Sequence, residues 1–202
     1  MKGEAKNFFS IFVTGFKSRF FIPVYQRNYD WQIDQCRRLF DDLEDLIRTK
    51  RESHFFGSIV SQAIETDIGS RTVIDGQQRV TTCFLLLFAL VHQVKKGMVK
   101  CEEPETFVDR ITEMYLVNKY APKESRLRLK PIKKDCEALE RIAEGKNDQL
   151  IESSNITVNY RYFLERIEKM EFSAEQLEKA FLSLIKESYS LKPETGLPSL
   201  YF

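Results

Sequence analysis

Apolar residues recur at helical spacing over much of the chain. Between Trp31 and Lys50 they return every three or four positions opposite a charged face, which predicts an amphipathic helix with Asp30 as its cap. A further short amphipathic helix is predicted within residues 1–30. Helical spacing also dominates after Gly97, where the last predicted helix opens with the capping-box pattern SAEQ. These later helices cover residues 106–119, 131–145, 153–170 and 173–188.

Segments rich in β-forming residues predict a small sheet. HFFGSIVSQAIE and RTVI are separated by the turn-like TDIGS, so this pair predicts an antiparallel hairpin over residues 54–74. The segment FFIPVYQRNY contains Pro23, which predicts an edge strand or a strand end. The alternating RLRLK predicts another short strand at residues 126–130. The chain therefore predicts an α+β fold, with a small mixed unit over residues 1–97 and a mostly helical lobe over residues 98–202.

The most apolar segment of the chain directly follows a cluster of polar residues. In RTVIDGQQRVTT a strand is predicted to end at Asp75-Gly76, and a helix to begin between Gln77 and Thr82. CFLLLFALV then continues this helix to about Lys96. This apolar run is half or less of the roughly 20 residues that a membrane span needs. Because the N-terminus also lacks a signal-peptide pattern, we expect a cytoplasmic protein that does not enter a membrane.

Composition and charge exclude several classes of function. The sequence is 43% apolar and 30% charged, which is typical of a soluble globular protein. Its 31 Lys and Arg nearly balance its 30 Asp and Glu, so any contact with nucleic acid would need a local basic patch. With only two histidines, a His-based nuclease centre is not expected. The cysteines form no CxxC pair and predict neither a zinc site nor disulfides, with Cys83 expected as a buried thiol: Cys36, Cys83, Cys101 and Cys136.

The Asp75-Gly76 turn is the first candidate site. A strand that ends where a helix begins directs free N–H groups and the positive end of a helix dipole at one point, which suits a phosphate. Arg79 could bind phosphate oxygens through its guanidinium, and Asp75 could hold a metal ion or orient a water. Alternatively, Asp75-Gly76 is a plain turn, Gln77 and Gln78 satisfy backbone groups, and Arg79 forms a surface ion pair. The GxxxxGK pattern of a Walker loop is absent from the sequence.

Aromatic residues alternate with polar ones in IPVYQRNYDW, residues 22–31. Aromatic faces beside Arg27 can stack a base or flank a phosphate, or they can belong to the core with Arg27 paired to an acid. In FFGSIV, Gly57 permits close approach of a ligand that Ser58 could contact, or it only relieves packing. On NITVNYRYF, core packing with polar tips is expected for Asn159, Tyr160 and Tyr162.

Together, IPVYQRNYDW, FFGSIV and VIDGQQRVTTCFLLLFAL resemble the N-terminal domain of GmrSD-type proteins, which are modification-dependent restriction and phage-defence proteins. The family motifs IPxYQRxYxW and DGQQR-[LV]TT are matched at every defining position over residues 20–92. The resemblance implies a ParB/sulfiredoxin-like fold, in which a small mixed sheet with helices is followed by a mostly helical lobe. Related sulfiredoxins carry a cysteine in the corresponding turn. Because DGQQR has none, sulfinic-acid reductase chemistry is not expected.

The resemblance also implies a ligand and its site. In the family, the DGQQR segment is taken to bind and hydrolyse nucleoside triphosphates with a divalent metal such as Mg²⁺, and to gate a nuclease. The catalytic residues implied are Asp75, Gln78 and Arg79, with Asp75 also holding Mg²⁺. The nucleotide-binding residues implied are Tyr25, Gln26, Arg27, Gly76, Gln77, Thr81 and Thr82. The residues of the ligand pocket implied are Tyr29, Trp31, Gly57 and Ser58.

The chain ends in LSLIKESYSLKPETGLPSLYF, without the strand, the IFExLNxxG-like segment or the HNH-type nuclease domain usual in the family. We therefore expect a C-terminally truncated member that lacks a sheet strand and has no nuclease activity of its own. Its expected function is that of a nucleotide-binding regulatory domain, with or without hydrolysis, acting on a nuclease domain or subunit encoded nearby. The alternatives are a non-catalytic module that senses DNA or docks a partner, and an inactive fragment. The apolar FFSIF could lie in an oligomer contact or in the core.

Overall fold

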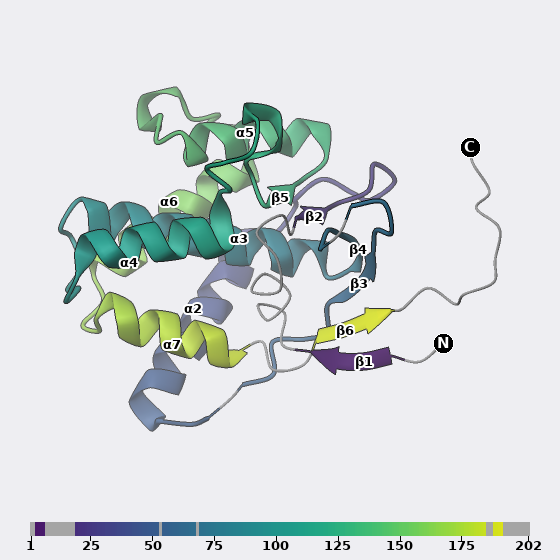
Figure 1. The fold of residues 1–202 in the computed structure, drawn as a ribbon. Helices are drawn as coiled ribbons and strands as arrows, with labels where there is room; N and C mark the ends of the chain where they lie inside the picture. The colour runs from purple at the N-terminus through teal and green to yellow at the C-terminus, as the bar shows by residue number, and fades with distance from the viewer. Residues whose placement is uncertain (1–2, 7–18, 53, 68, 185–187, 192–202) are drawn as a thin grey trace.

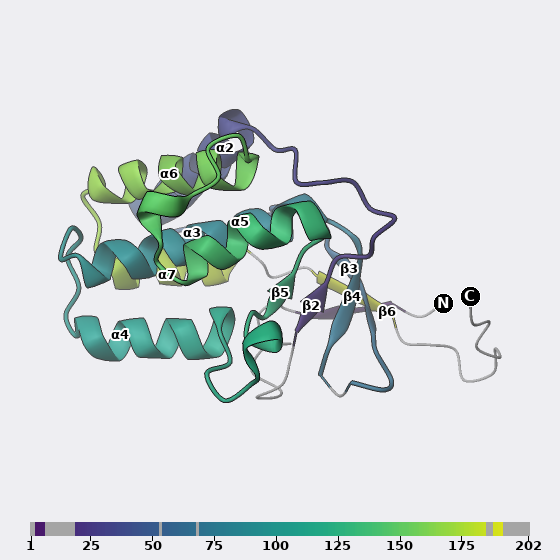
Figure 2. The same cartoon turned by 90° about the horizontal axis from the view of Figure 1, so that it is seen from above.

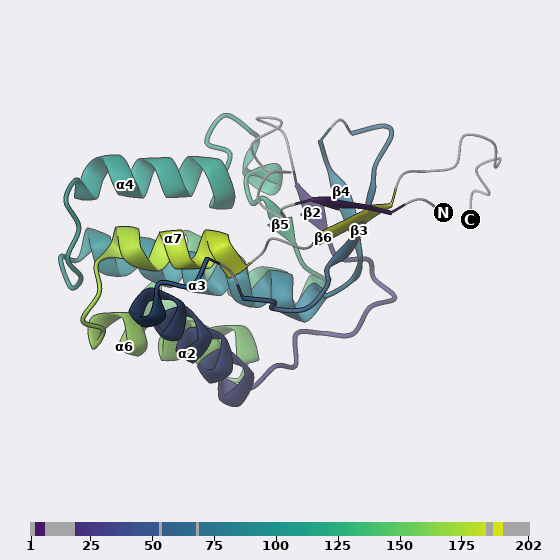
Figure 3. The ribbon, with the colours of Figure 1, turned by 90° about the horizontal axis from the view of Figure 1, so that it is seen from below.

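The computed structural model describes residues 3–6, 19–52, 54–67, 69–184 and 188–191. Figure 1 shows the strands at one end of the molecule and most of the helices gathered beside them. Figures 2 and 3 show the same division from two further directions. A small sheet therefore stands against a larger helical body, which confirms the predicted α+β class.

The sheet has six strands in the order β1-β6-β3-β4-β2-β5. Strands β3 and β4 are antiparallel, which confirms the predicted hairpin, whereas β2 is parallel to both β4 and β5. Strand β6 is parallel to β3 and antiparallel to β1, so the sheet is mixed. The strands are β1 (Gly3–Lys6), β2 (Phe20–Phe21), β3 (Val60–Ala63), β4 (Arg71–Asp75), β5 (Leu129–Lys130) and β6 (Ser188–Leu191).

The helices follow the predicted pattern closely in the middle of each element and less well at the ends. Residues 112–116 form a π-helical turn instead of continuing the helix before them. Short 3₁₀ turns lie at residues 123–125 and 147–149. The α-helices are α2 (Ile33–Thr49), α3 (Gln77–Lys95), α4 (Pro104–Ile111), α5 (Lys133–Ala143), α6 (Asn155–Glu168) and α7 (Ala174–Leu184).

Helix α3 is the centre of the core. It lies between α4 on one side and α2 with α6 on the other, and it packs against α4 and α6 (Figures 2 and 3). Every residue from Val80 to Val91 is buried, because a helix covered on all sides can be apolar on all faces. Cys83 is fully buried as predicted, and burial raises the pKa of its thiol. No helix within the described residues has the length and apolarity to cross a membrane.

Two predicted boundaries are corrected by the structure, and a third, which was left open, is decided by it. Asp30 does not cap α2, because its carboxylate pairs with Arg27 at 2.8 Å and Gln32 is the capping residue. The last helix was predicted to reach residue 188, but Ser188 belongs to β6, and helix α7 is described over Ala174–Leu184. Of the two predicted starts of α3, the structure has the earlier one, at Gln77.

The predicted lack of a C-terminal strand is wrong. The segment SYSL forms β6, which lies between β1 and β3. Sequence spacing did not indicate it, because its partners lie far away along the chain, at Gly3–Lys6 and Val60–Ala63. The sheet therefore draws strands from both sides of residue 97. The helix predicted within residues 1–30 and the apolar FFSIF fall largely on residues 7–18, outside the described residues.

Candidate functional site

The strand order brings the sequence motifs IPVYQRNYDW, FFGSIV and DGQQR to one place. Strands β2 and β4 are neighbours and parallel, so the loop after β2 (residues 22–31) and the turn at Asp75-Gly76 lie at the same edge of the sheet. On the other side of β4, residues 54–59 lead into β3. Ligands of α/β sheets bind outside the carboxyl ends of parallel strands. The N-terminus of α3, between these two segments, is therefore the candidate site.

Gly76 allows α3 to start immediately after β4. Its φ is 86°, a left-handed conformation, and an added Cβ would lie 3.0 Å from Ile59 Cγ1 and 3.1 Å from the carbonyl oxygen of Ser58. The first helical hydrogen bond runs from the N–H of Val80 to the carbonyl of Gly76 at 3.0 Å. Gly76 has no side chain to cap the helix, and the first turn contains no acidic residue. The positive end of the α3 dipole is therefore not offset by the helix's own side chains.

The two glutamines of DGQQR bind the backbone of the 22–31 loop. Gln77 Nε2 donates to the carbonyl of Arg27 at 3.1 Å. Gln78 Oε1 accepts from the N–H of Asp30 at 3.0 Å, and its Nε2 donates to the carbonyl of Asn28 at 3.0 Å. Both side chains are only 6% exposed. A glutamine can satisfy a backbone donor and a backbone acceptor together, so these residues join the two motifs.

A second layer of side chains holds the same loop from behind. The Tyr29 hydroxyl lies 2.7 Å from Thr82 Oγ1, and it accepts a hydrogen bond from Asn159 Nδ2 at 3.0 Å. Asn159 Nδ2 also donates to the carbonyl of Trp31 at 2.7 Å. The N–H of Tyr29 donates to Asp135 Oδ2 at 2.7 Å. Burial, with a smaller effect of the nearby Cys36 thiol, raises the pKa of Tyr29 well above its usual value, so the phenol stays neutral.

Arg79 lies against Gly57. Its Nη1 donates to the carbonyl of Ser58 at 3.2 Å, and a Cβ on Gly57 would come within 2.6 Å of its Nε. Gly57 also has a positive φ of 97°. The absence of a side chain at Gly57 therefore makes room for the Arg79 guanidinium of the same chain. The surface ion pair considered for Arg79 is not found among the residues that the structure describes.

The 22–31 loop presents other side chains to the solvent. Tyr25 is 74% exposed and Val24 is 91% exposed, so neither belongs to the core. Arg27 is also exposed, and its guanidinium pairs with the carboxylate of Asp30 at 2.8 Å, which confirms the alternative that Arg27 is paired to an acid. Gln26 Nε2 donates to the carbonyl of Ile74 at 3.0 Å, which ties the loop to the end of β4. The loop therefore has a fixed backbone and a free outer surface.

The structure separates the predicted site residues into two groups. Asp75 is exposed at the end of β4, and Arg79 and Ser58 are half-buried beside it. By contrast, Thr81 and Thr82 are buried, and Thr82 Oγ1 donates to the carbonyl of Gln78 at 2.8 Å. The phosphate-facing role implied for these threonines and the catalytic role implied for Gln78 stay predictions. The trace of the chain brings together, around the start of α3, Gln26, Arg27, Tyr29, Trp31, Gly57, Ser58, Asp75, Gly76, Gln77, Gln78 and Arg79.

Two contributors to this arrangement were not predicted as functional. Asn159 was expected to pack in the core, although its motif NITVNYRYF had been noted. Asp135 carried no signal in the sequence, because its partner is a backbone N–H that lies 106 residues away.

Asp75 could hold a metal ion only together with ligands from a bound molecule. Within the described residues no group of three or more His, Cys, Asp and Glu side chains could enclose a metal ion. Mg²⁺ is commonly held by one or two carboxylates together with phosphate oxygens of the substrate. Asp75 is a single exposed carboxylate, so it suits an ion that arrives with a nucleotide.

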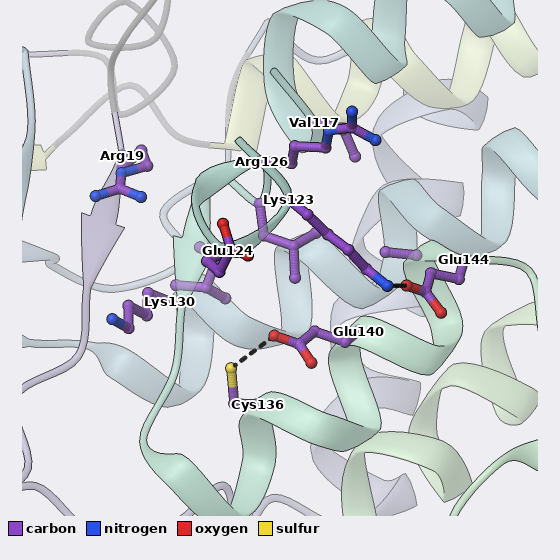
Figure 4. A pocket seen from close by; sticks show the side chains of 12 residues that line it. Arg19, Val117, Lys123, Glu124, Arg126, Lys130, Cys136, Glu140 and Glu144 are labelled. Carbon is purple, nitrogen blue, oxygen red and sulfur yellow. Dashed lines mark hydrogen bonds and ion pairs between the residues drawn. The ribbon is translucent and has the colours of Figure 1, made fainter. Parts of the chain in front are cut away.

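A cavity of about 680 Å³ lies apart from these residues, beside β5 and α5 (Figure 4). Cations and carboxylates both line it, and Lys123 pairs with Glu144 at 3.3 Å. Cys136 donates to Glu140 at 3.4 Å, and burial raises the pKa of this thiol to about 11, so it is not a nucleophile near neutral pH. Because the charges around this cavity are mixed, they favour neither an anion nor a cation.

The α+β fold and the two interlocked motifs define a domain built around a strand, the DGQQR turn and a buried helix. The family model for the N-terminal domain of GmrSD restriction endonucleases matches residues 9–197, nearly the whole chain. The chain therefore belongs to this family, which confirms the resemblance predicted from the motifs. No individual curated protein matches the chain significantly. The family places the chain among restriction and defence proteins.

Proposed function

We propose that this domain binds a nucleoside triphosphate at the start of α3 and hydrolyses it to regulate a restriction nuclease. The observation that carries the proposal is the N-terminus of α3, which has no side-chain cap and lies at the carboxyl ends of β2 and β4. Such a helix end attracts phosphate through its N–H groups and its dipole. The half-buried Arg79 beside it adds a fixed positive charge.

Backbone and side-chain groups around the start of α3 have different roles in the proposed binding. The first-turn N–H groups and Arg79 bind phosphate oxygens, while Tyr25 offers an aromatic face on which a base can stack. Asp75 would hold Mg²⁺ together with the phosphates, and the ion would neutralise phosphate charge when bound. Gln77 and Gln78 hold the 22–31 loop at a fixed distance from the start of α3, through hydrogen bonds to the loop backbone.

Hydrolysis requires that negative charge on the leaving phosphates be offset. Arg79 and the helix N-terminus are already in place before the reaction, so they stabilise this charge without reorganisation. Asp75, at the surface end of β4, orients the attacking water. Hydrolysis, which releases phosphate and leaves the diphosphate bound, would then change the charge beside the fixed 22–31 loop and so the surface offered to a nuclease domain or subunit.

Phosphate release with Mg²⁺ and each nucleoside triphosphate tests this function. Arg79→Ala and Asp75→Asn should lower the rate at least tenfold, since each removes a group that contacts the phosphates or the water. Matched controls are Arg38→Ala, at an exposed position of α2, and Asp148→Asn, at an exposed position before α6. Equal rates in the Arg79 and Arg38 variants would refute the proposed site.

The exposed tip of the 22–31 loop also supports a second candidate function, a DNA-sensing module. Val24 and Tyr25 are exposed next to the exposed Arg27, and apolar and aromatic side chains beside a cation can contact bases and backbone. DNA binding that weakens with salt and survives Asp75→Asn, in a protein that releases no phosphate, would favour this function over the first.

A further inference from the structure

The backbone around Trp31 is held from two helices at once. Gln78 Oε1, on α3, accepts from the N–H of Trp31 at 3.4 Å. Asn159 Nδ2, on α6, donates to the carbonyl of Trp31 at 2.7 Å. The ring of Trp31 stands edge-on to Phe56 at a centroid distance of 6.2 Å, which adds a contact with the segment that carries Gly57. Trp31 is therefore fixed on both of its peptide groups and on its ring.

Burying Asn159 lowers the stability of the core. It is fully buried, and its Oδ1 has no hydrogen-bond partner in the part of the chain that the structure describes. A buried acceptor without a partner costs about 1–3 kcal/mol, whereas an apolar side chain of the same shape would avoid that cost. Packing alone therefore does not explain an asparagine at this position. Its two donated bonds, to Tyr29 and Trp31, do.

We propose that Asn159 is a positioning residue of the nucleotide site, through which α6 fixes the 22–31 loop. The two bonds from Asn159 Nδ2 hold Tyr29 and Trp31, directly after the segment that carries Tyr25 and Arg27. Gln77 holds the same segment at the carbonyl of Arg27. Because α3 and α6 both bind the 22–31 loop, the exposed side chains of this loop stay at a fixed distance from the N-terminus of α3. The consequence for affinity rests on the proposed nucleotide function, whereas the restraint on Trp31 does not.

Trp31 is the only tryptophan in the sequence, so its fluorescence reports on this position alone. The informative variant is Asn159→Leu, which keeps the branched shape of the side chain but donates no hydrogen bond. The control is Val158→Ala, at a neighbouring position of α6 where the side chain is 36% exposed. Three quantities are measured in each protein: acrylamide quenching of Trp31, the midpoint of thermal unfolding, and the affinity for magnesium-bound nucleoside triphosphate.

Asn159→Leu should increase the quenching of Trp31 and weaken nucleotide binding roughly tenfold, while the unfolding midpoint falls only slightly, because removing the unpartnered Oδ1 offsets part of the loss of the donor to the Trp31 carbonyl. Val158→Ala should leave the quenching and the affinity unchanged. Unchanged quenching in Asn159→Leu would overturn the proposal, whether or not any nucleotide binds. Increased quenching with undiminished affinity would also overturn it, because the restraint would then have no effect on the site. If the wild-type protein binds no nucleotide, the proposed function fails, while the quenching result still decides the restraint.

Discussion

At the residue scale, the contact between Gly57 and Arg79 explains why a glycine precedes β3. The guanidinium occupies the space that a Cβ on Gly57 would need, at 2.6 Å from Arg79 Nε. A side chain at this position would therefore move Arg79 away from the start of α3. Gly57 therefore affects the proposed nucleotide site only through the position of Arg79.

Replacing Gly57 by alanine should destabilise the protein and weaken nucleotide binding together. A non-glycine residue at positive φ costs about 1–3 kcal/mol, and the displaced guanidinium adds to this. Gly97→Ala is the matched control, because Gly97 also has a positive φ, of 69°, but nothing lies within 4 Å of an added Cβ. Urea unfolding and nucleotide titration compare the two. Equal losses in both variants would show that the Arg79 contact is unimportant.

Gln78→Ala should cost about 2–4 kcal/mol in unfolding free energy, because three backbone groups of the 22–31 loop lose their partner. Gln62→Ala, at an exposed position of β3, should stay within about 0.5 kcal/mol of the wild type. Chemical denaturation measures both. If the two variants lose similar amounts, the glutamine does not hold the loop.

At the scale of elements, α3 and α6 are joined by a polar contact inside an apolar interface. His92 Nδ1 lies 2.6 Å from the Tyr160 hydroxyl. Burial, with smaller effects of Lys95 and Lys96, lowers the pKa of His92 to about 4. The imidazole is therefore neutral in the folded protein at neutral pH.

The depressed pKa of His92 makes stability depend on pH. The unfolded chain binds a proton at a higher pH than the folded chain, so stability is complete above about pH 6.5 and falls as the pH drops toward 4. Between pH 7 and pH 5 the wild type should lose about 1–2 kcal/mol that His92→Asn does not lose. Unfolding free energies at the two pH values test this. Parallel losses in both proteins would assign the effect to other groups.

The elements also show which parts of the fold a sequence can predict. Helix α3 was predictable because its residues are apolar on every face, and the β3–β4 hairpin because its strands are close in the chain. Strand β6 was not predictable, because the short segment SYSL pairs only with strands that are distant in the chain, β1 and β3. The motifs indicated the candidate site, and the structure confirms the alternative in which Gln77 and Gln78 satisfy backbone groups, but the motifs could not decide for it. That depends on backbone groups about 50 residues away.

At the scale of the whole molecule, the site depends on segments from the entire chain. The 22–31 loop is held by Gln77 and Gln78 on α3, Asp135 on α5 and Asn159 on α6. Residues that bind the backbone of a distant segment leave no periodic pattern in the sequence. For this reason Asp135 and Asn159 became visible only in the structure. Residues after Gly97 thus help to hold the candidate site in place.

Calorimetric titration of the folded protein with magnesium-bound nucleoside triphosphates tests the central claim most directly. We expect saturable binding that Arg79→Ala weakens about tenfold to a hundredfold, as the loss of a charge-assisted contact of about 1.5–3 kcal/mol requires. Arg38→Ala should bind as the wild type does. Absence of binding to every nucleoside triphosphate, or equal affinity of the Arg79 variant and the wild type, would contradict a nucleotide site at the start of α3.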